Sequence, residues 1–218
     1  MKKFFVKALA AIAILSVCAS CDKPTPEGPE KATLRSIIAE DDATFSGISN
    51  NGKWAVGYTF NNNDNAGFAI AASIWNLETG ERTILADPEV GMSEANCVND
   101  EGTIIGGAYL NQPAYYQNDI WTNLEIPEGY TMGTVSAMAE VNGSIIFVGY
   151  VQDGPEAQSI AAAKWVNGVY EKANPNSLRR DRLGEAANVN TCYDISEDGN
   201  VIMGSLEFNS YTNMIPFV

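Results

Sequence analysis

The chain contains no histidine, and this absence removes the commonest general base and the commonest metal ligand. A serine nucleophile also needs a base, and the sequence has no G-x-S-x-G motif. Residues Asp194–Gly199 match the start of an EF-hand loop, but Ser205 stands where that loop needs a glutamate. We therefore expect no metal, no cofactor and a function other than catalysis. Carboxylate pairs among the 27 acidic residues leave a polysaccharide hydrolase open as one alternative.

Basic residues are also scarce in this chain. It has 13 Lys and Arg residues against 27 Asp and Glu residues, which gives a formal net charge of −14. Such an excess of negative charge repels phosphate backbones and anionic lipid surfaces. The composition therefore predicts that nucleic acid is not a partner.

Long apolar runs are missing except near the N-terminus, where Ala8–Val17 follows three lysines and precedes the small residues Cys18–Ser20. This pattern is typical of an export signal, and it is too short to span a bilayer comfortably. We assign residues 1–20 to a signal peptide, residues 21–32 to a Pro-rich tether and residues 33–218 to the folded domain.

Cys21 follows small residues and precedes the polar tether, an arrangement that resembles a bacterial lipobox. It departs from that pattern at Cys18, where a branched aliphatic residue is usual. The resemblance implies that Cys21 is lipidated, and several acyl chains, at about 0.8 kcal/mol per buried methylene, would hold the protein on a membrane. We expect a lipid-anchored protein of the cell envelope, at the outer membrane. Ordinary signal cleavage that leaves Cys21 as a free thiol is the alternative.

Residues 33–218 contain one short unit four times. Each copy has an apolar strand, a polar turn that ends in glycine, and a second apolar strand that ends in another glycine. The copies are ISNNGKWAVGY (48–58), CVNDEGTIIGG (97–107), MAEVNGSIIFVGY (138–150) and ISEDGNVIMGS (195–205). Asn-Gly and Asp-Gly pairs favour tight turns, so each copy is predicted to be a β-hairpin. A bulge or a close backbone approach is indicated by the closing glycines, Gly57, Gly107, Gly149 and Gly204.

A wider frame repeats as well. Three copies are followed by an apolar run that ends in tryptophan, namely Ala69–Trp75, Asp119–Trp121 and Ile160–Trp165, and then by a further strand. The turn glycines Gly52, Gly102, Gly143 and Gly199 are 50, 41 and 56 residues apart, a spacing of propeller-blade size. We therefore predict an all-β, β-propeller-like fold with about four repeats of four-stranded antiparallel blades.

Leu34–Ile38 is predicted to be the outer strand of a blade whose inner strands lie elsewhere in the sequence. Either four blades close into a ring by pairing this strand with the C-terminal blade, or the chain is the N-terminal part of a larger propeller. We favour the second arrangement, because Val218 occupies a position just before the tryptophan of the other repeats. A last strand that stops there would leave an exposed strand edge.

Cys97 and Cys192 lie in the first strands of the second and fourth repeats, which are not neighbours. We therefore expect two buried thiols. A disulfide between them is the alternative that an oxidising compartment would allow.

The repeated pattern ISxDGxxxxG, followed by AxxW, resembles the extracellular repeats of the HAF type and the propeller-type lipoproteins of Bacteroidota. The residues that carry it include Ile195–Gly204 and Ala72–Trp75, and the resemblance covers residues 45–218. It implies a secreted or surface-anchored β-propeller and does not imply a particular chemistry.

Binding is predicted on the face that carries the loops between second and third strands and between blades, because these loops are the longest. They are rich in Asn, Gln and Tyr and include the only basic cluster. The candidate ligand-binding residues are Asn61, Asn62, Asp64, Tyr115, Tyr116, Arg179, Arg180 and Tyr211. Exposed tyrosine rings beside amides would suit a sugar. We expect a binding module for glycan or protein; a structural envelope lipoprotein is the alternative, and the loops could also be merely solvated.

The lipid anchor gives the first testable prediction. Replacing Cys21 by alanine should abolish incorporation of labelled palmitate and move the protein out of the membrane fraction, whereas Cys18→Ala should leave both unchanged. Metabolic labelling with fractionation measures both effects. Unchanged labelling of the Cys21→Ala protein would contradict the prediction.

Overall fold

A computed structural model describes residues 42–61, 69–85, 92–154, 160–172, 189–207 and 215–217. Every regular element in these ranges is a β-strand, which confirms the prediction of an all-β fold. The predicted signal peptide, the tether and Leu34–Ile38 lie outside the described residues. Within the ranges described, no helix is long and apolar enough to cross a membrane.

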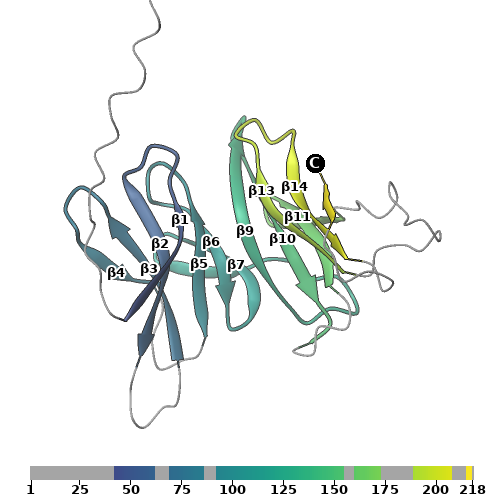
Figure 1. Ribbon diagram of the computed structural model, residues 1–218, viewed down its shortest axis with the longest axis horizontal. Coiled ribbons are helices and arrows are strands. Elements are labelled where there is room, and N and C mark those ends of the chain that lie inside the picture. The colour runs from purple at the N-terminus through teal and green to yellow at the C-terminus, as the bar shows by residue number, and fades with distance from the viewer. Residues whose placement is uncertain are drawn as a thin grey trace, which may run out of the picture. The chain divides into compact units, whose positions relative to one another are not determined.

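The first two blades are antiparallel sheets whose four strands pair in chain order (Figure 1). The strands of the first are β1 (Ala43–Ile48), β2 (Trp54–Asn61), β3 (Ala69–Asn76) and β4 (Arg82–Ile84). The strands of the second are β5 (Ser93–Val98), β6 (Ile105–Tyr109), β7 (Gln112–Gln117) and β8 (Ile120–Asn123).

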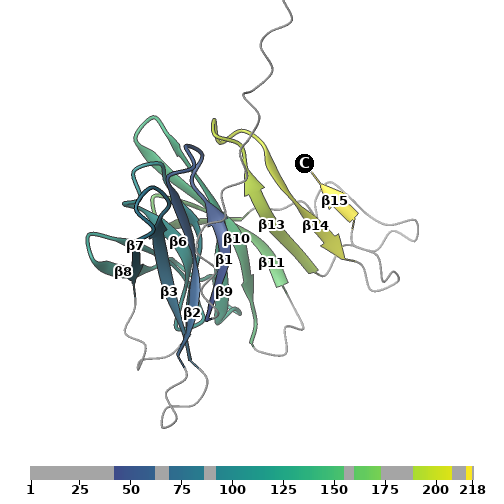
Figure 2. The ribbon, with the colours of Figure 1, turned by 60° about the vertical axis from the view of Figure 1, so that its left-hand side comes forward.

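The third and fourth blades follow the same pattern. The third consists of β9 (Met132–Val141), β10 (Ser144–Gln152), β11 (Ile160–Val166) and β12 (Val169–Lys172). The described strands of the fourth are β13 (Val189–Ile195), β14 (Ile202–Glu207) and β15 (Ile215–Phe217). A parallel bridge between Ile160 and Val189 joins these two blades into one seven-stranded sheet, and Figure 2 shows β13 beside β11 at this junction. The predicted succession of β-propeller-like blades is confirmed.

Consecutive blades contact one another through their first strands. Strand β5 lies against β1, β2 and β3, strand β9 against β5, β6 and β7, and strand β13 against β9, β10 and β11. The first strands β1, β5, β9 and β13 therefore form a row, and we call them the inner strands.

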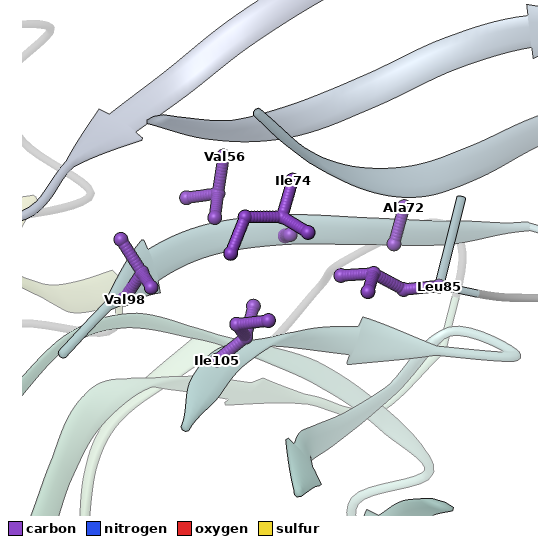
Figure 3. Close-up of a cluster of buried hydrophobic side chains, with 7 residues drawn as sticks. Val56, Ala72, Ile74, Leu85, Val98 and Ile105 are labelled. Atoms are coloured by element: carbon purple, nitrogen blue, oxygen red, sulfur yellow. The ribbon is translucent and has the colours of Figure 1, made fainter. Parts of the chain in front are cut away.

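The hydrophobic core lies between the blades. At the first boundary, the side chains of Val56, Ala72 and Ile74 point toward those of Val98 and Ile105 (Figure 3). The second boundary buries Phe147 and Trp165 with Leu124, and the third buries Val148 with Cys192 and Ile195. Because burial of apolar surface contributes roughly 25 cal/mol per Å², these boundaries are the main source of stability.

Each inner strand bulges opposite the closing glycine of its hairpin. The register shifts fall after Phe45, Ala95, Val135 and Cys192, which pair with Gly57, Gly107, Gly149 and Gly204. A Cβ atom on Gly57, Gly107 or Gly149 would overlap the main-chain oxygen of Thr44, Glu94 or Thr134. The prediction of a bulge or a close approach at these glycines is therefore confirmed, and both features occur together.

The hairpin turns also match the sequence. Gly52, Gly102 and Gly199 have φ angles of 70°, 72° and 72°. In the first and fourth copies, a serine before the turn closes it with a hydrogen bond. Ser49 Oγ accepts from the Trp54 N–H (3.0 Å), and Ser196 Oγ accepts from the Val201 N–H (2.9 Å). The recurring serine thus satisfies a main-chain donor that the turn leaves open.

The third strand of the second blade was misplaced by the sequence pattern. The prediction that Asp119–Trp121 forms this strand is wrong, because β7 covers Gln112–Gln117 and Trp121 lies in β8. Two tight turns, at Leu110-Asn111 and Asn118-Asp119, flank β7, and all four of their residues have φ between 53° and 64°. Neither turn contains the glycine that normally marks a positive φ.

The closing glycine gives the second prediction. Gly149→Ala should lower the free energy of unfolding by about 3 kcal/mol, because the strand must move away from Thr134. Gly143→Ala is the matched control: it keeps only the cost of a positive φ, about 1 kcal/mol, since no atom lies within 4 Å of its added Cβ. Urea unfolding followed by tryptophan fluorescence measures both. Equal losses for the two variants would contradict the role of the close approach.

Candidate functional site

A groove follows the row of inner strands next to their hairpin turns, and we call it the inner-strand groove. Its volume is about 490 Å³, and residues from all four blades line it. Its polar lining residues include Asn50, Asn96, Asn99, Asp100, Glu101, Ser136, Glu140, Tyr193, Asp194 and Glu197. The hairpin repeat builds this site, because each copy contributes the end of an inner strand, and the first, second and fourth copies also contribute the turn that follows it.

Negative charge dominates the inner-strand groove. Five exposed carboxylates line it, from Asp100, Glu101, Glu140, Asp194 and Glu197, and none of the described lining residues is Lys or Arg. Like charges gathered in one groove produce a negative potential that attracts cations. The groove therefore suits a ligand that is positively charged or rich in hydrogen-bond donors.

Hydrogen bonds between neighbouring blades hold the turns that carry these carboxylates. Asp100 accepts a hydrogen bond from the Asn51 N–H at Oδ1 and another from Asn51 Nδ2 at its main-chain oxygen, both at 2.8 Å. Asn99 Nδ2 donates to Glu140 Oε1 at 2.9 Å. The first turn, the second turn and the end of β9 are thus tied together, so Asp100 and Glu140 are positioned before any ligand arrives.

In the second, third and fourth blades, the bulge directs one extra residue of the inner strand toward this groove, namely Asn96, Ser136 and Tyr193. In the second blade this residue is Asn96, whose Nδ2 donates to the Val135 carbonyl (2.9 Å) and to Thr134 Oγ1 (3.0 Å) of the next blade. In the fourth blade it is Tyr193, whose side chain is 48% exposed. Asn96 therefore fixes a blade boundary, while Tyr193 gives the groove a half-exposed aromatic ring.

Cys97 also lines the groove, but it is not a reactive thiol. Desolvation by burial raises the pKa of Cys97 to about 12, and it does the same for Cys192. Both residues are free cysteines; Cys192 is buried, as predicted, whereas Cys97 is only partly buried. A protonated thiol is a poor nucleophile and a poor metal ligand.

The two predicted tyrosines of the second blade lie in strand β7 and not in a loop, which corrects their placement. The Tyr115 ring stacks on Phe147 with 5.4 Å between ring centroids, and Tyr116 contacts Trp121 at 5.5 Å. Both are partly buried at blade boundaries. The reason for expecting an exposed sugar platform at these tyrosines is therefore removed, because a two-residue turn replaces the predicted loop.

Of the other predicted binding residues, the structure describes Asn61. Asn61 ends β2, at the strand end away from the hairpin turn. The remaining five, Asn62, Asp64, Arg179, Arg180 and Tyr211, lie outside the described residues, so their role stays a prediction. The structure does not bring Asn61 together with the inner-strand groove.

The groove residues were missed by the sequence reasoning, which gave the hairpin turns no role. A signal was present: an acidic residue directly precedes the turn glycine in the second and fourth copies, and Glu140 lies three residues before it in the third. Asp198, in the fourth turn, is held locally, because hydrogen bonds from Ser196 Oγ (2.6 Å) and from Asn200 lower its pKa. Among the described residues, no three His, Cys, Asp or Glu side chains are arranged to hold a metal ion.

Comparisons with known proteins add little to this picture. No protein-family model matches the chain, and no curated protein matches it. Among solved structures it is similar to TolB from Acinetobacter baumannii, with a TM-score of 0.46 and 15% sequence identity. That match covers 78% of this chain and 42% of the TolB chain. A likeness this distant carries no argument about function.

The thiols give the third prediction. Because a pKa near 12 leaves about one thiolate in ten thousand at pH 8, Cys97 and Cys192 should resist alkylation in the folded protein. In 6 M guanidinium chloride both should react at the rate of an unfolded peptide. Peptide mass spectrometry after timed treatment with iodoacetamide measures the two rates. Rapid alkylation of Cys97 in the native protein would contradict the raised pKa of its thiol.

Proposed function

We propose that this chain is a non-catalytic binding module of the cell envelope, and that its ligand is a positively charged segment of a partner protein. The observation that carries the proposal is the inner-strand groove, in which the second, third and fourth blades present five carboxylates and none of the described lining residues is basic. Charge complementarity of this kind selects partners and speeds their encounter. The lipid anchor predicted at Cys21 would place the groove at the envelope.

The groove favours a ligand that makes several contacts at once. Exposed ion pairs contribute only about 0.2–1 kcal/mol each, and salt screens them. A single cation would therefore bind weakly, whereas an extended segment with several Lys or Arg residues would reach carboxylates on neighbouring blades. The half-exposed ring of Tyr193 adds a surface for a cation–π contact.

The carboxylates are also prepared for binding. Asp100 and Glu140 already accept hydrogen bonds from Asn51 and Asn99, which restricts their motion. A ligand that pairs with them loses less conformational entropy on their side than it would with free side chains. The same arrangement offers acceptors, a protonated thiol and amides, a set that suits recognition better than bond cleavage.

A glycan is the second candidate ligand. The Tyr193 ring and the Asn50 side chain line the same groove. An aromatic face beside an amide can bind a sugar, because the ring contacts its apolar face and the amide forms hydrogen bonds with its hydroxyl groups. The long-loop face stays a further proposed surface for the same ligand class.

The fourth prediction tests the proposed groove. The triple variant Glu101→Gln, Glu140→Gln, Asp194→Asn keeps the side-chain shapes and should weaken binding of an alternating Gly-Lys peptide by roughly tenfold at low salt, because three ion pairs are lost. The matched control is Glu78→Gln, Glu81→Gln, Glu128→Gln, which removes the same charge from exposed residues outside the groove. Fluorescence anisotropy of a labelled peptide measures both.

The outcomes are distinct. Equal weakening by both triple variants would show that only net charge matters and would contradict the groove as the site. Failure of the parent chain to bind the peptide, together with binding on a glycan array that the groove variant loses, would replace the protein ligand by a glycan.

A further inference from the structure

Every blade boundary in this chain is built from two faces. The incoming face of a blade contacts the preceding blade, and the outgoing face contacts the following one. On the incoming faces of the second, third and fourth blades, the residue opposite the closing glycine is buried: these residues are Ala95, Val135 and Cys192. Phe45 holds the same register position in the first blade, yet it is 45% exposed.

The incoming face of the first blade is apolar over a wider area. Ile48 is 63% exposed, whereas its counterpart Val98 is 7% exposed. Phe45, Ile48, Ala55 and Leu77 line a hollow of about 450 Å³ together with Ser46 and Gly47. This surface therefore has the composition of a blade boundary, but only in this blade does the structure leave it open.

Trp75 supplies an independent sign of a missing neighbour. Its side chain is 3% exposed and contacts Phe45, yet its Nε1–H has no hydrogen-bond partner among the described residues. Trp165, at the same register position in the third blade, donates to the Glu125 carbonyl next to the preceding blade at 2.8 Å. Trp121 likewise donates to the Leu85 carbonyl at 2.8 Å. A buried donor without a partner costs about 1–3 kcal/mol, so an acceptor is expected here.

The complementary half of the interface is exposed on the fourth blade. Met203 is 46% exposed, although Val56 and Val148, its counterparts on outgoing faces, are fully buried. Val201 is also 46% exposed. Its counterparts Trp54 and Ile146 cover the turn glycines Gly102 and Gly199 of the next blade, whereas Gly52 in the first blade, like Gly143 in the third, has nothing within 4 Å of an added Cβ.

We propose that the fourth blade of a second copy of this chain docks on the first blade and repeats the internal boundary. In this contact Val201 covers Gly52, Met203 packs on Phe45, and a main-chain carbonyl of the docked blade accepts the Trp75 Nε1–H. The contact is head-to-tail, because it joins two different surfaces of the same molecule. Ile48 lines both this face and the inner-strand groove, but the contact does not depend on the proposed ligand.

The choice of a second copy rests on continuity with the internal boundaries. Apolar side chains pack at all three of them, the turn glycine is covered at the first and the third, and both halves of the proposed contact occur on one molecule. An unrelated partner would have to reproduce both the apolar contacts and the carbonyl acceptor, whereas the fourth blade belongs to the repeat that already provides them.

The fifth prediction uses two variants of the full chain that each lose one face. Phe45→Asp removes the incoming face and Met203→Asp removes the outgoing face, so neither variant should associate with itself. A mixture of the two should form dimers, because each supplies the face that the other lacks. Val169→Asp is the control, since Val169 is 60% exposed on β12 and belongs to neither face. Analytical ultracentrifugation measures the association.

Hydrogen exchange of the tryptophan indole N–H, followed by nuclear magnetic resonance, gives the second readout. Exchange at Trp75 should slow by more than about tenfold when the parent chain is concentrated, and it should stay fast in each single variant. Exchange at Trp165 should not change. If Phe45→Asp does not fold, Ile48→Asp tests the same face without touching Trp75.

Two results would overturn the proposal. A mixture of the two variants that stays monomeric would show that the faces do not pair. Slow exchange at Trp75 that is independent of concentration would show that the chain covers this face by itself.

Discussion

The close approach between a main-chain oxygen and the closing glycine is the contact on which this architecture depends. At Gly57, Gly107 and Gly149, a main-chain oxygen of the inner strand occupies the position that the Cβ atom of any other residue would need. The inner strand can then carry an extra residue, and its bulge bends it toward the next blade. Gly47 extends the same principle across a boundary, because a Cβ atom there would overlap the main-chain oxygen of Asn96. Glycine is therefore needed both within a blade and between blades.

This packing determines where polar side chains from different blades come together. Because the inner strands lie in a row, the turn that follows each of them falls beside the turns of the neighbouring blades. Asn51 and Asn99 use that proximity to hold Asp100 and Glu140 across two boundaries. The acidic groove is thus a consequence of the repeat, and its charge comes from residues that vary between copies.

The sequence predicts the repeating parts of this structure and fails where the signal is not local. Turn glycines and closing glycines located the four hairpins, because a positive φ and a close approach both exclude other residues. The strands of the second blade were not predicted correctly, because Leu110-Asn111 and Asn118-Asp119 adopt positive φ without glycine. As a result, Tyr115 and Tyr116 lie in β7 and Trp121 lies in β8. The groove was not predicted either, because its carboxylates come from residues between positions 100 and 197 that only the strand register brings together.

The most direct test of the account is to map where a lysine-rich peptide binds, using chemical-shift changes in nuclear magnetic resonance. The account predicts that the shifts follow the turns after the inner strands, including Asn50, Asp100, Glu140 and Tyr193, and that they fade as salt is added. Shifts confined to the ends of strands away from these turns, or shifts insensitive to salt, would contradict it.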